Sequence, residues 1–103
     1  MKFEEKKEVF NSFQDLKERS ISYSRINYEY PASVQRGKIL ARELHPSGNG
    51  YVLGKYMSAD VVKSNGYSVD SRGWISISNF TREELINVIN NAMMSMSGKA
   101  TKS

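Results

Sequence analysis

The fold of this chain is decided by residues 71–85, which read SRGWISISNFTREEL. The first half of this stretch alternates polar and apolar residues, as in a strand whose side chains point to opposite faces of a sheet. Ile75 and Ile77 would share one face, whereas Arg72 and Trp74 would share the other. The stretch therefore predicts a strand with one apolar face and one face that places a cation beside an aromatic ring.

The second half of the same stretch predicts the start of a helix. Thr81 and Glu84 stand at the two positions of a capping box, in which each side chain bonds the backbone amide of the other residue. Phe80 and Leu85 stand at the hydrophobic-staple positions around this cap. Apolar residues then recur at helical spacing to about Met96, so we expect a long helix whose wide apolar stripe packs against the sheet.

Three further strands are expected before this stretch. Residues 21–30 are rich in Ile and Tyr and end at Pro31, which has no amide to donate to a ladder. Residues 38–44 and 51–57 flank the turn-rich sequence HPSGNG and so predict a hairpin. Because these connections are short, neighbouring strands should run antiparallel.

The remaining segments complete the expected organisation. Residues 2–19 carry apolar side chains at helical spacing, so residues 1–20 are expected to form an N-terminal helix. Residues 58–66 suit either a short capped helix or an irregular excursion. Residues 21–97 would form the folded domain and residues 98–103 a flexible tail. We therefore expect an α+β fold: a four-stranded antiparallel curved sheet with a C-terminal helix on one face and an N-terminal helix.

Composition limits the classes of function. The chain has 103 residues, enough for one domain, and no apolar run approaches the roughly 20 residues of a membrane span. The first residues lack the apolar core of a signal peptide, so we expect a cytoplasmic protein, in the host cytoplasm if the chain is viral. The chain has no Cys, which excludes disulfides and thiolate metal sites, and its single His, His45, lies in the predicted turn. We expect no enzymatic activity, no cofactor and no metal site.

The charge of the chain favours a polyanionic partner, though only slightly. The formal net charge is +4 at pH 7, and residues 21–78 hold seven basic and four acidic side chains. The excess of positive charge therefore lies in the strand-rich middle of the chain. A basic surface attracts polyanions over about 10 Å at ordinary salt concentration.

One face of the predicted sheet combines cations with aromatic rings. The opposite, apolar face is expected to pack under the last helix; its residues are Ile26, Ile39, Val52, Ile75 and Ile77. Cations hold phosphates, and aromatic rings stack on unpaired bases with about 1–3 kcal/mol per base. Since paired bases offer no such face, the combination favours single-stranded nucleic acid. The predicted nucleic-acid-binding residues are Arg25, Arg36, Lys38, Arg42, Tyr51, Lys55, Arg72 and Trp74.

Other interpretations of these residues stay open. Tyr and Trp favour strands in any protein, and Lys or Arg often blunts the edge of a sheet. Trp74 would suit a buried core or a dimer interface as well as a stacking platform. RNA binding uses the same physics as DNA binding and is not separated from it by the sequence. The apolar helix 82–96 and the tyrosines would alternatively suit a protein-interaction or inhibitory accessory module from a mobile element.

A family pattern runs through the same residues. Residues 36–43 read RGKILARE, residues 72–77 read RGWISI, and an acidic-capped helix follows. This pattern resembles the positive cofactor 4 family of transcriptional coactivators, in which a strand opens with a basic-Gly-Lys triplet and ends in Arg-Glu. A Lys-Gly-Ile-Ser-Leu-like strand and a closing helix follow in that family. The resemblance covers roughly residues 21–95.

The resemblance implies a function for the domain at residues 21–97. Members of that family are homodimers that bind single-stranded DNA on the concave faces of their sheets. The resemblance implies that this chain would bind single-stranded DNA without strong sequence preference, in transcription, replication or repair. Transcription or replication machinery would then be a wider partner. The matching positions are Arg36, Lys38, Arg42 and Arg72, whereas Tyr51 and Lys55 correspond only loosely. The chain departs from the family pattern where Trp74 interrupts the Lys-Gly-Ile run and where Leu44 and His45 replace an aromatic residue.

Overall fold

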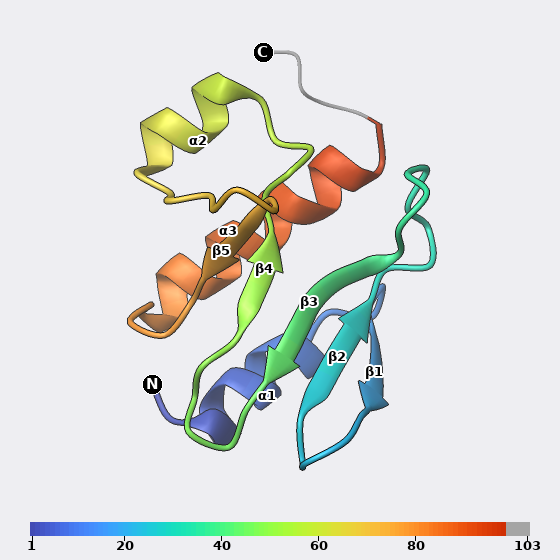
Figure 1. The fold of residues 1–103 in the computed structure, drawn as a ribbon, viewed down its shortest axis with the longest axis vertical. Helices are drawn as coiled ribbons and strands as arrows, with labels where there is room; N and C mark the ends of the chain where they lie inside the picture. Colours follow the sequence, from blue (N-terminus) through green and yellow to red (C-terminus); the bar gives the residue numbers. More distant parts are fainter. Residues whose placement is uncertain (99–103) are drawn as a thin grey trace.

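The computed structural model describes residues 1–98, and the part of the predicted tail at 99–103 lies outside the described residues. The chain forms an α+β fold around one antiparallel sheet, whose strands follow one another in chain order (Figure 1). The elements are α1 (Phe3–Asn11), β1 (Lys17–Ser20), β2 (Ile26–Glu29), β3 (Ile39–Leu44), β4 (Tyr51–Leu53), α2 (Ala59–Asn65), β5 (Trp74–Ser76) and α3 (Arg82–Met96).

The sheet is covered on one face only. Helices α1 and α3 lie behind the sheet in Figure 1, and the face toward the viewer carries no helix. The covered face and the two helices together form the core, whose fully buried side chains include Phe10, Tyr28, Val52, Ile75 and Ile89. We call the uncovered side of the sheet the open face; its central residues are Arg42, Tyr51, Leu53, Trp74 and Ser76, as the strand register requires.

The N-terminal helix is shorter than predicted. It ends at Asn11, and residues 17–20 form strand β1, which pairs with β2 from Lys17 opposite Glu29 to Ser20 opposite Ile26. All four β1 side chains are exposed, so this strand carries no apolar pattern that periodicity could detect. Its charges are typical of an edge strand. Within the described residues the sheet therefore has five strands, and the prediction of four strands and of a helix over residues 1–20 was wrong in this detail.

The C-terminal half contains the predicted elements, although β4 ends at Leu53 and residues 54–57, predicted as strand, form a turn. The α3 cap is a capping box, in which the Thr81 amide donates to Glu84 Oε1 at 2.8 Å and the Glu84 amide donates to Thr81 Oγ1 at 3.2 Å. The hairpin of β3 and β4 also forms. Of the two alternatives for residues 58–66, the short helix α2 is present, with Ser58 as its N-cap and Gly66 in the left-handed conformation that ends it.

Strand β3 contains two irregularities that change which side chains reach the core. Tyr28 pairs with Ala41 while Glu29 pairs with Ile39, so Leu40 is an extra residue in this strand. A bulge of this kind lets two successive side chains point to one face. Leu40 and Ala41 are therefore both buried. Ile39, which was predicted for the core face, is instead 36% exposed and lies on the open face.

The second irregularity lies further along β3. Ile26 pairs with Leu44, so three steps along β3 correspond to two steps along β2. Glu43 takes a left-handed conformation here, with φ of 56°. Leu44 consequently returns to the core, whereas Arg42 and Glu43 both stay half-exposed on the open face.

Lys6 fastens α1 to the sheet. Its side chain is fully buried, and Nζ donates to the carbonyl oxygens of Gly48 at 2.6 Å, Ile77 at 2.9 Å and Ser78 at 3.1 Å. Burial lowers the pKa of this ammonium group. The three carbonyl oxygens accept from all three N–H groups of the ammonium, so this buried charge is fully hydrogen-bonded. Nothing in the sequence indicates this role, since Lys6 looks like an ordinary exposed residue of the helix.

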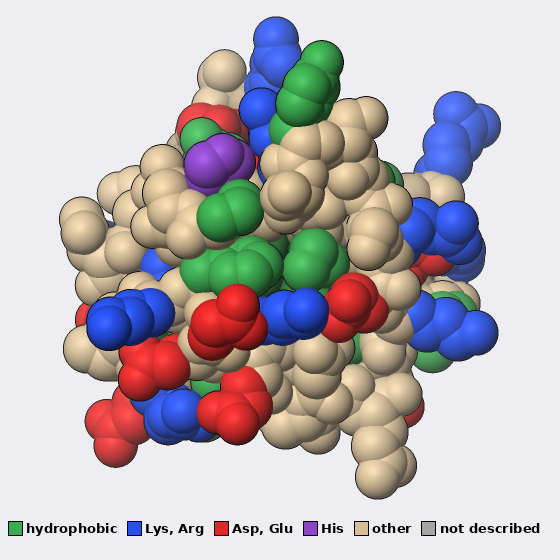
Figure 2. All heavy atoms as spheres, turned by 90° about the horizontal axis from the view of Figure 1, so that it is seen from below, with side chains coloured by type: hydrophobic (Ala, Val, Ile, Leu, Met, Phe, Trp, Pro, Cys, Tyr) green, Lys and Arg blue, Asp and Glu red, His purple; other side chains and the backbone are tan. Residues whose placement is uncertain are grey.

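The helical side carries charges of both signs. Viewed from below in Figure 2, acidic and basic side chains lie side by side in the lower part of the molecule, and the single His lies above them. Arg82 of α3 contacts Glu8 of α1 at 3.7 Å. No helix within residues 1–98 is long and apolar enough to cross a membrane.

Candidate nucleic-acid interface

The open face gathers most of the predicted binding residues from separate parts of the chain. Arg36 stands exposed in the connection between β2 and β3, outside the strands. The other predicted residues lie on the open face or line cavities at its two ends; they are Arg25, Lys38, Arg42, Tyr51, Lys55, Arg72 and Trp74.

The centre of this face is a guanidinium group over two aromatic rings. Arg42 of β3 lies beside Tyr51 of β4 in the strand register. Its Cζ stands 5.6 Å from the Tyr51 ring centroid and 4.6 Å from that of Trp74. Both distances are within the range of a cation–π interaction. Trp74 is thus half-buried on the open face and not enclosed in the core, while Arg42 covers part of one face of its indole.

A cavity with basic walls lies at the end of the open face near α2. Its volume is about 310 Å³, and it combines cations from three segments with an apolar floor. We call it the basic cavity; its lining residues are Gly37, Lys38, Ile39, Leu53, Lys55, Tyr56, Arg72 and Trp74. Lys55 Nζ lies 5.6 Å from the centroid of the Tyr56 ring, and Lys38 Nζ donates to the Ser33 carbonyl oxygen.

The turn before β5 fixes the positions of Arg72 and Trp74. One oxygen of Asp70 accepts hydrogen bonds from the Arg72 amide at 2.8 Å and the Trp74 amide at 3.0 Å. These bonds, that of Trp74 first, hold the pKa of the Asp70 carboxyl below its usual value. Gly73 has φ of 92°, and a Cβ added there would lie 2.6 Å from Cβ of Lys55. Only glycine therefore lets the turn close against the β4 end of the basic cavity.

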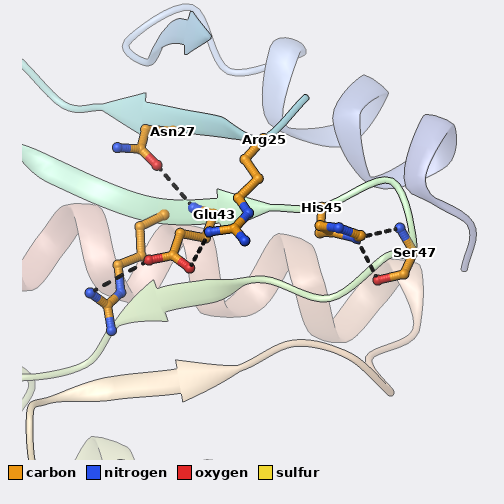
Figure 3. A network of polar contacts seen from close by, with 6 residues as sticks. Arg25, Asn27, Glu43, His45 and Ser47 are labelled. Carbon is orange, nitrogen blue, oxygen red and sulfur yellow. Dashed lines mark hydrogen bonds and ion pairs between the residues drawn. The ribbon is translucent and has the colours of Figure 1, made fainter. Parts of the chain in front are cut away.

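The opposite end of the open face holds an ion-pair network centred on Glu43 (Figure 3). Glu43 Oε1 lies 3.4 Å from Arg25 Nη1, and Glu43 Oε2 lies 3.9 Å from Arg42 Nη1. The Glu43 amide donates to Asn27 Oδ1 at 2.9 Å. Arg25 also stands over the exposed ring of Tyr23, at 5.8 Å from its centroid. A second, polar cavity of about 210 Å³ opens here; its lining residues are Arg25, Glu43, His45, Ser47, Asn49 and Tyr51.

His45 lies in the turn where the sequence placed it. Its Nδ1 accepts a hydrogen bond from the Ser47 amide at 3.0 Å and lies 2.9 Å from Ser47 Oγ. These local contacts stabilise the turn between β3 and β4. Within residues 1–98 no group of three or more metal-ligating side chains lies together.

Several residues of the interface were not foreseen from the sequence. Ile39, Leu53 and Tyr56 line the basic cavity, and Glu43 joins the arginines at the other end. Strict alternation assigned Ile39 to the core, and the bulges that reverse this assignment leave no clear pattern in the sequence. The pair Arg42–Glu43 was visible, but the left-handed conformation that keeps both side chains on one face was not.

No protein-family model, curated protein or solved structure matches this chain.

Proposed function

We propose that this protein binds single-stranded nucleic acid on the open face of its sheet, without strong sequence preference. The observation that carries the proposal is the basic cavity, whose lining combines Lys38, Lys55 and Arg72, from separate segments, with the rings of Tyr56 and Trp74. Three cations and aromatic rings in one cavity suit a nucleotide whose base stacks and whose phosphates are neutralised.

The two kinds of contact have different consequences. Each phosphate neutralised by a cation steepens the salt dependence of binding, by about 0.7 logarithmic units per phosphate for single strands. Stacking on Tyr56, or on the part of the Trp74 ring that Arg42 leaves open, requires a base that is not paired. The geometry thus supports a single strand better than a duplex, whose bases present only their edges.

The resemblance to the positive cofactor 4 family leads to the same proposal from the sequence. It adds single-stranded DNA as the preferred ligand, a homodimer, and a role in transcription, replication or repair. RNA remains the alternative ligand, since stacking and phosphate contacts serve both.

The protein-interaction alternative relied on the apolar stripe of the last helix and on the tyrosines. In the structure this stripe packs in the core of the monomer, with Leu85, Val88, Ile89, Ala92 and Met96 buried. Ile86 and Met94 are the apolar side chains of α3 that stay exposed. The stripe therefore needs no partner to explain it. The exposed ring of Tyr23 remains as support for the alternative, whereas the basic cavity supports nucleic-acid binding.

The proposal is tested with a fluorescent oligo-dT of about 20 nucleotides, a length that spans several phosphate contacts. Anisotropy titrations at increasing salt should show binding that weakens steeply. Arg72→Ala should weaken binding about threefold or more through the lost phosphate contact, and Trp74→Ala about fivefold or more through the lost stacking. A parallel titration with oligo-U compares RNA with DNA.

Arg82→Ala is the matched control. It removes the same charge from α3, where Arg82 contacts Glu8 on the helical side. It should leave the affinity within about twofold, as expected for a charge outside the interface. If Arg72→Ala and Trp74→Ala bind like wild type while both variants keep its thermal unfolding midpoint, the open face is not the binding site.

A further inference from the structure

Glu43 places a carboxylate between two arginines of the open face. Its two oxygens lie 3.4 Å from Arg25 Nη1 and 3.9 Å from Arg42 Nη1 (Figure 3). The contact with Arg25 is a long hydrogen bond from Nη1 to Oε1, and the contact with Arg42 is a longer ion pair. All three side chains are about one third exposed, at 38% for Arg25 and Glu43 and 30% for Arg42, so solvent reaches the carboxylate.

The backbone holds Glu43 in this place in spite of its conformational preference. A left-handed conformation is costly for a residue with a Cβ. Here it coincides with the second bulge of β3 and with the hydrogen bond from the Glu43 amide to Asn27 Oδ1. Bulges are common where a sheet must redirect a side chain at a functional site.

The arginine on the inner side of this network is fixed by other contacts. Arg42 stacks over Trp74 and Tyr51, and its Nε is buried without a hydrogen-bond partner among the described residues. These contacts with the two rings do not involve Glu43.

We propose that the Glu43 carboxylate occupies the position of a backbone phosphate of the bound single strand and competes with it. This inference rests on the proposed function. A phosphate accepts hydrogen bonds from guanidinium groups as a carboxylate does, and its several oxygens can face Arg25 and Arg42 together. Binding then requires Glu43 to turn outward. Glu43 acts as a built-in competitor that lowers the affinity for any anion unable to contact both arginines.

Glu43→Gln tests this inference, with Glu29→Gln as its matched control. Both substitutions remove one negative charge from the same sheet, but Glu29 pairs with Arg19 of the edge strand, at 2.9 Å. Exposed ion pairs are weak, so the expected effects are modest. Glu43→Gln releases two arginines and should strengthen oligo-dT binding about threefold to tenfold. Glu29→Gln should leave the affinity within about twofold of that of wild type. The Glu43→Gln variant retains the backbone amide that bonds Asn27, and its thermal unfolding midpoint should stay near that of wild type.

A second variant, Glu43→Gly, removes the carboxylate and also the conformational strain, so it should likewise bind more tightly. The inference is overturned if both Glu43 variants bind no more tightly than Glu29→Gln, or if they bind more weakly than wild type, since Glu43 would then organise the arginines and not compete for them. If wild type binds no oligo-dT but Glu43→Gln does, the inference that the Glu43 carboxylate competes with phosphate is supported. If neither wild type nor any variant binds, both the proposed function and this inference are wrong.

Discussion

Asp70 shapes the interface through one carboxylate oxygen. That oxygen accepts hydrogen bonds from the amides of Arg72 and Trp74, so one side chain holds the backbone of both residues. An Asp in such a turn imitates a backbone acceptor, and its charge strengthens both bonds. The lowered pKa of Asp70 is the thermodynamic counterpart of these bonds.

The pH dependence of stability follows from that shift. Because the folded-state pKa of Asp70 lies below the ordinary value of 3.8, the unfolded chain binds more protons between the two values. Its contribution to stability is therefore fully present above pH 3.8 and is lost as the pH falls through the folded-state pKa. Thermal unfolding between about pH 2 and pH 5 should show a smaller fall in midpoint for Asp70→Asn than for wild type, because the amide accepts the same bonds without titrating.

Asp60→Asn supplies the control for this series, since it removes one carboxylate from the first turn of α2, outside the turn before β5. Its midpoint should fall with acid as that of wild type does. An Asp70→Asn profile that runs parallel to wild type over the whole range would contradict the role assigned to Asp70.

Strand β3 shows where element-level prediction from the sequence stops. Capping residues, turn sequences and apolar periodicity predicted α3, the β3–β4 hairpin and the α+β class, because each of these leaves a local pattern. The two bulges of β3 depend on pairing with β2, a tertiary contact, and they place Leu40 in the core and Ile39 outside it. Strand β1 was missed for a related reason: backbone pairing holds it, and its exposed side chains carry no period.

The bulges make a prediction that strict alternation would reverse. Leu40→Ala removes a fully buried side chain and should lower the free energy of unfolding by about 2–5 kcal/mol. Ile39→Ala removes a side chain that is 36% exposed and should cost less, about 1 kcal/mol. Urea unfolding followed by circular dichroism measures both. Equal losses, or a larger loss for Ile39→Ala, would show that β3 does not contain the first bulge.

At the scale of the whole molecule, the two sides of the sheet have different chemistry. The covered side, with α1 and α3, uses the apolar residues of both helices to build the core. The open face carries cations and aromatic rings, and a cavity lies at each of its ends. Strand parity in β4 and β5 predicted that Tyr51 and Trp74 lie on the open face. The position of Glu43 and the apolar lining of the basic cavity were not predicted, because they depend on the bulges of β3.

Chemical-shift mapping with a short oligo-dT would show whether a single strand binds on the open face. Amide and indole signals of ¹⁵N-labelled protein would be followed during titration at low salt. We expect the largest shifts at the Trp74 indole and in residues 38–43, 51–56 and 70–74, with the signals of α1 and α3 nearly unchanged. Shifts confined to α1 and α3, or spread evenly over the whole surface, would contradict binding on the open face.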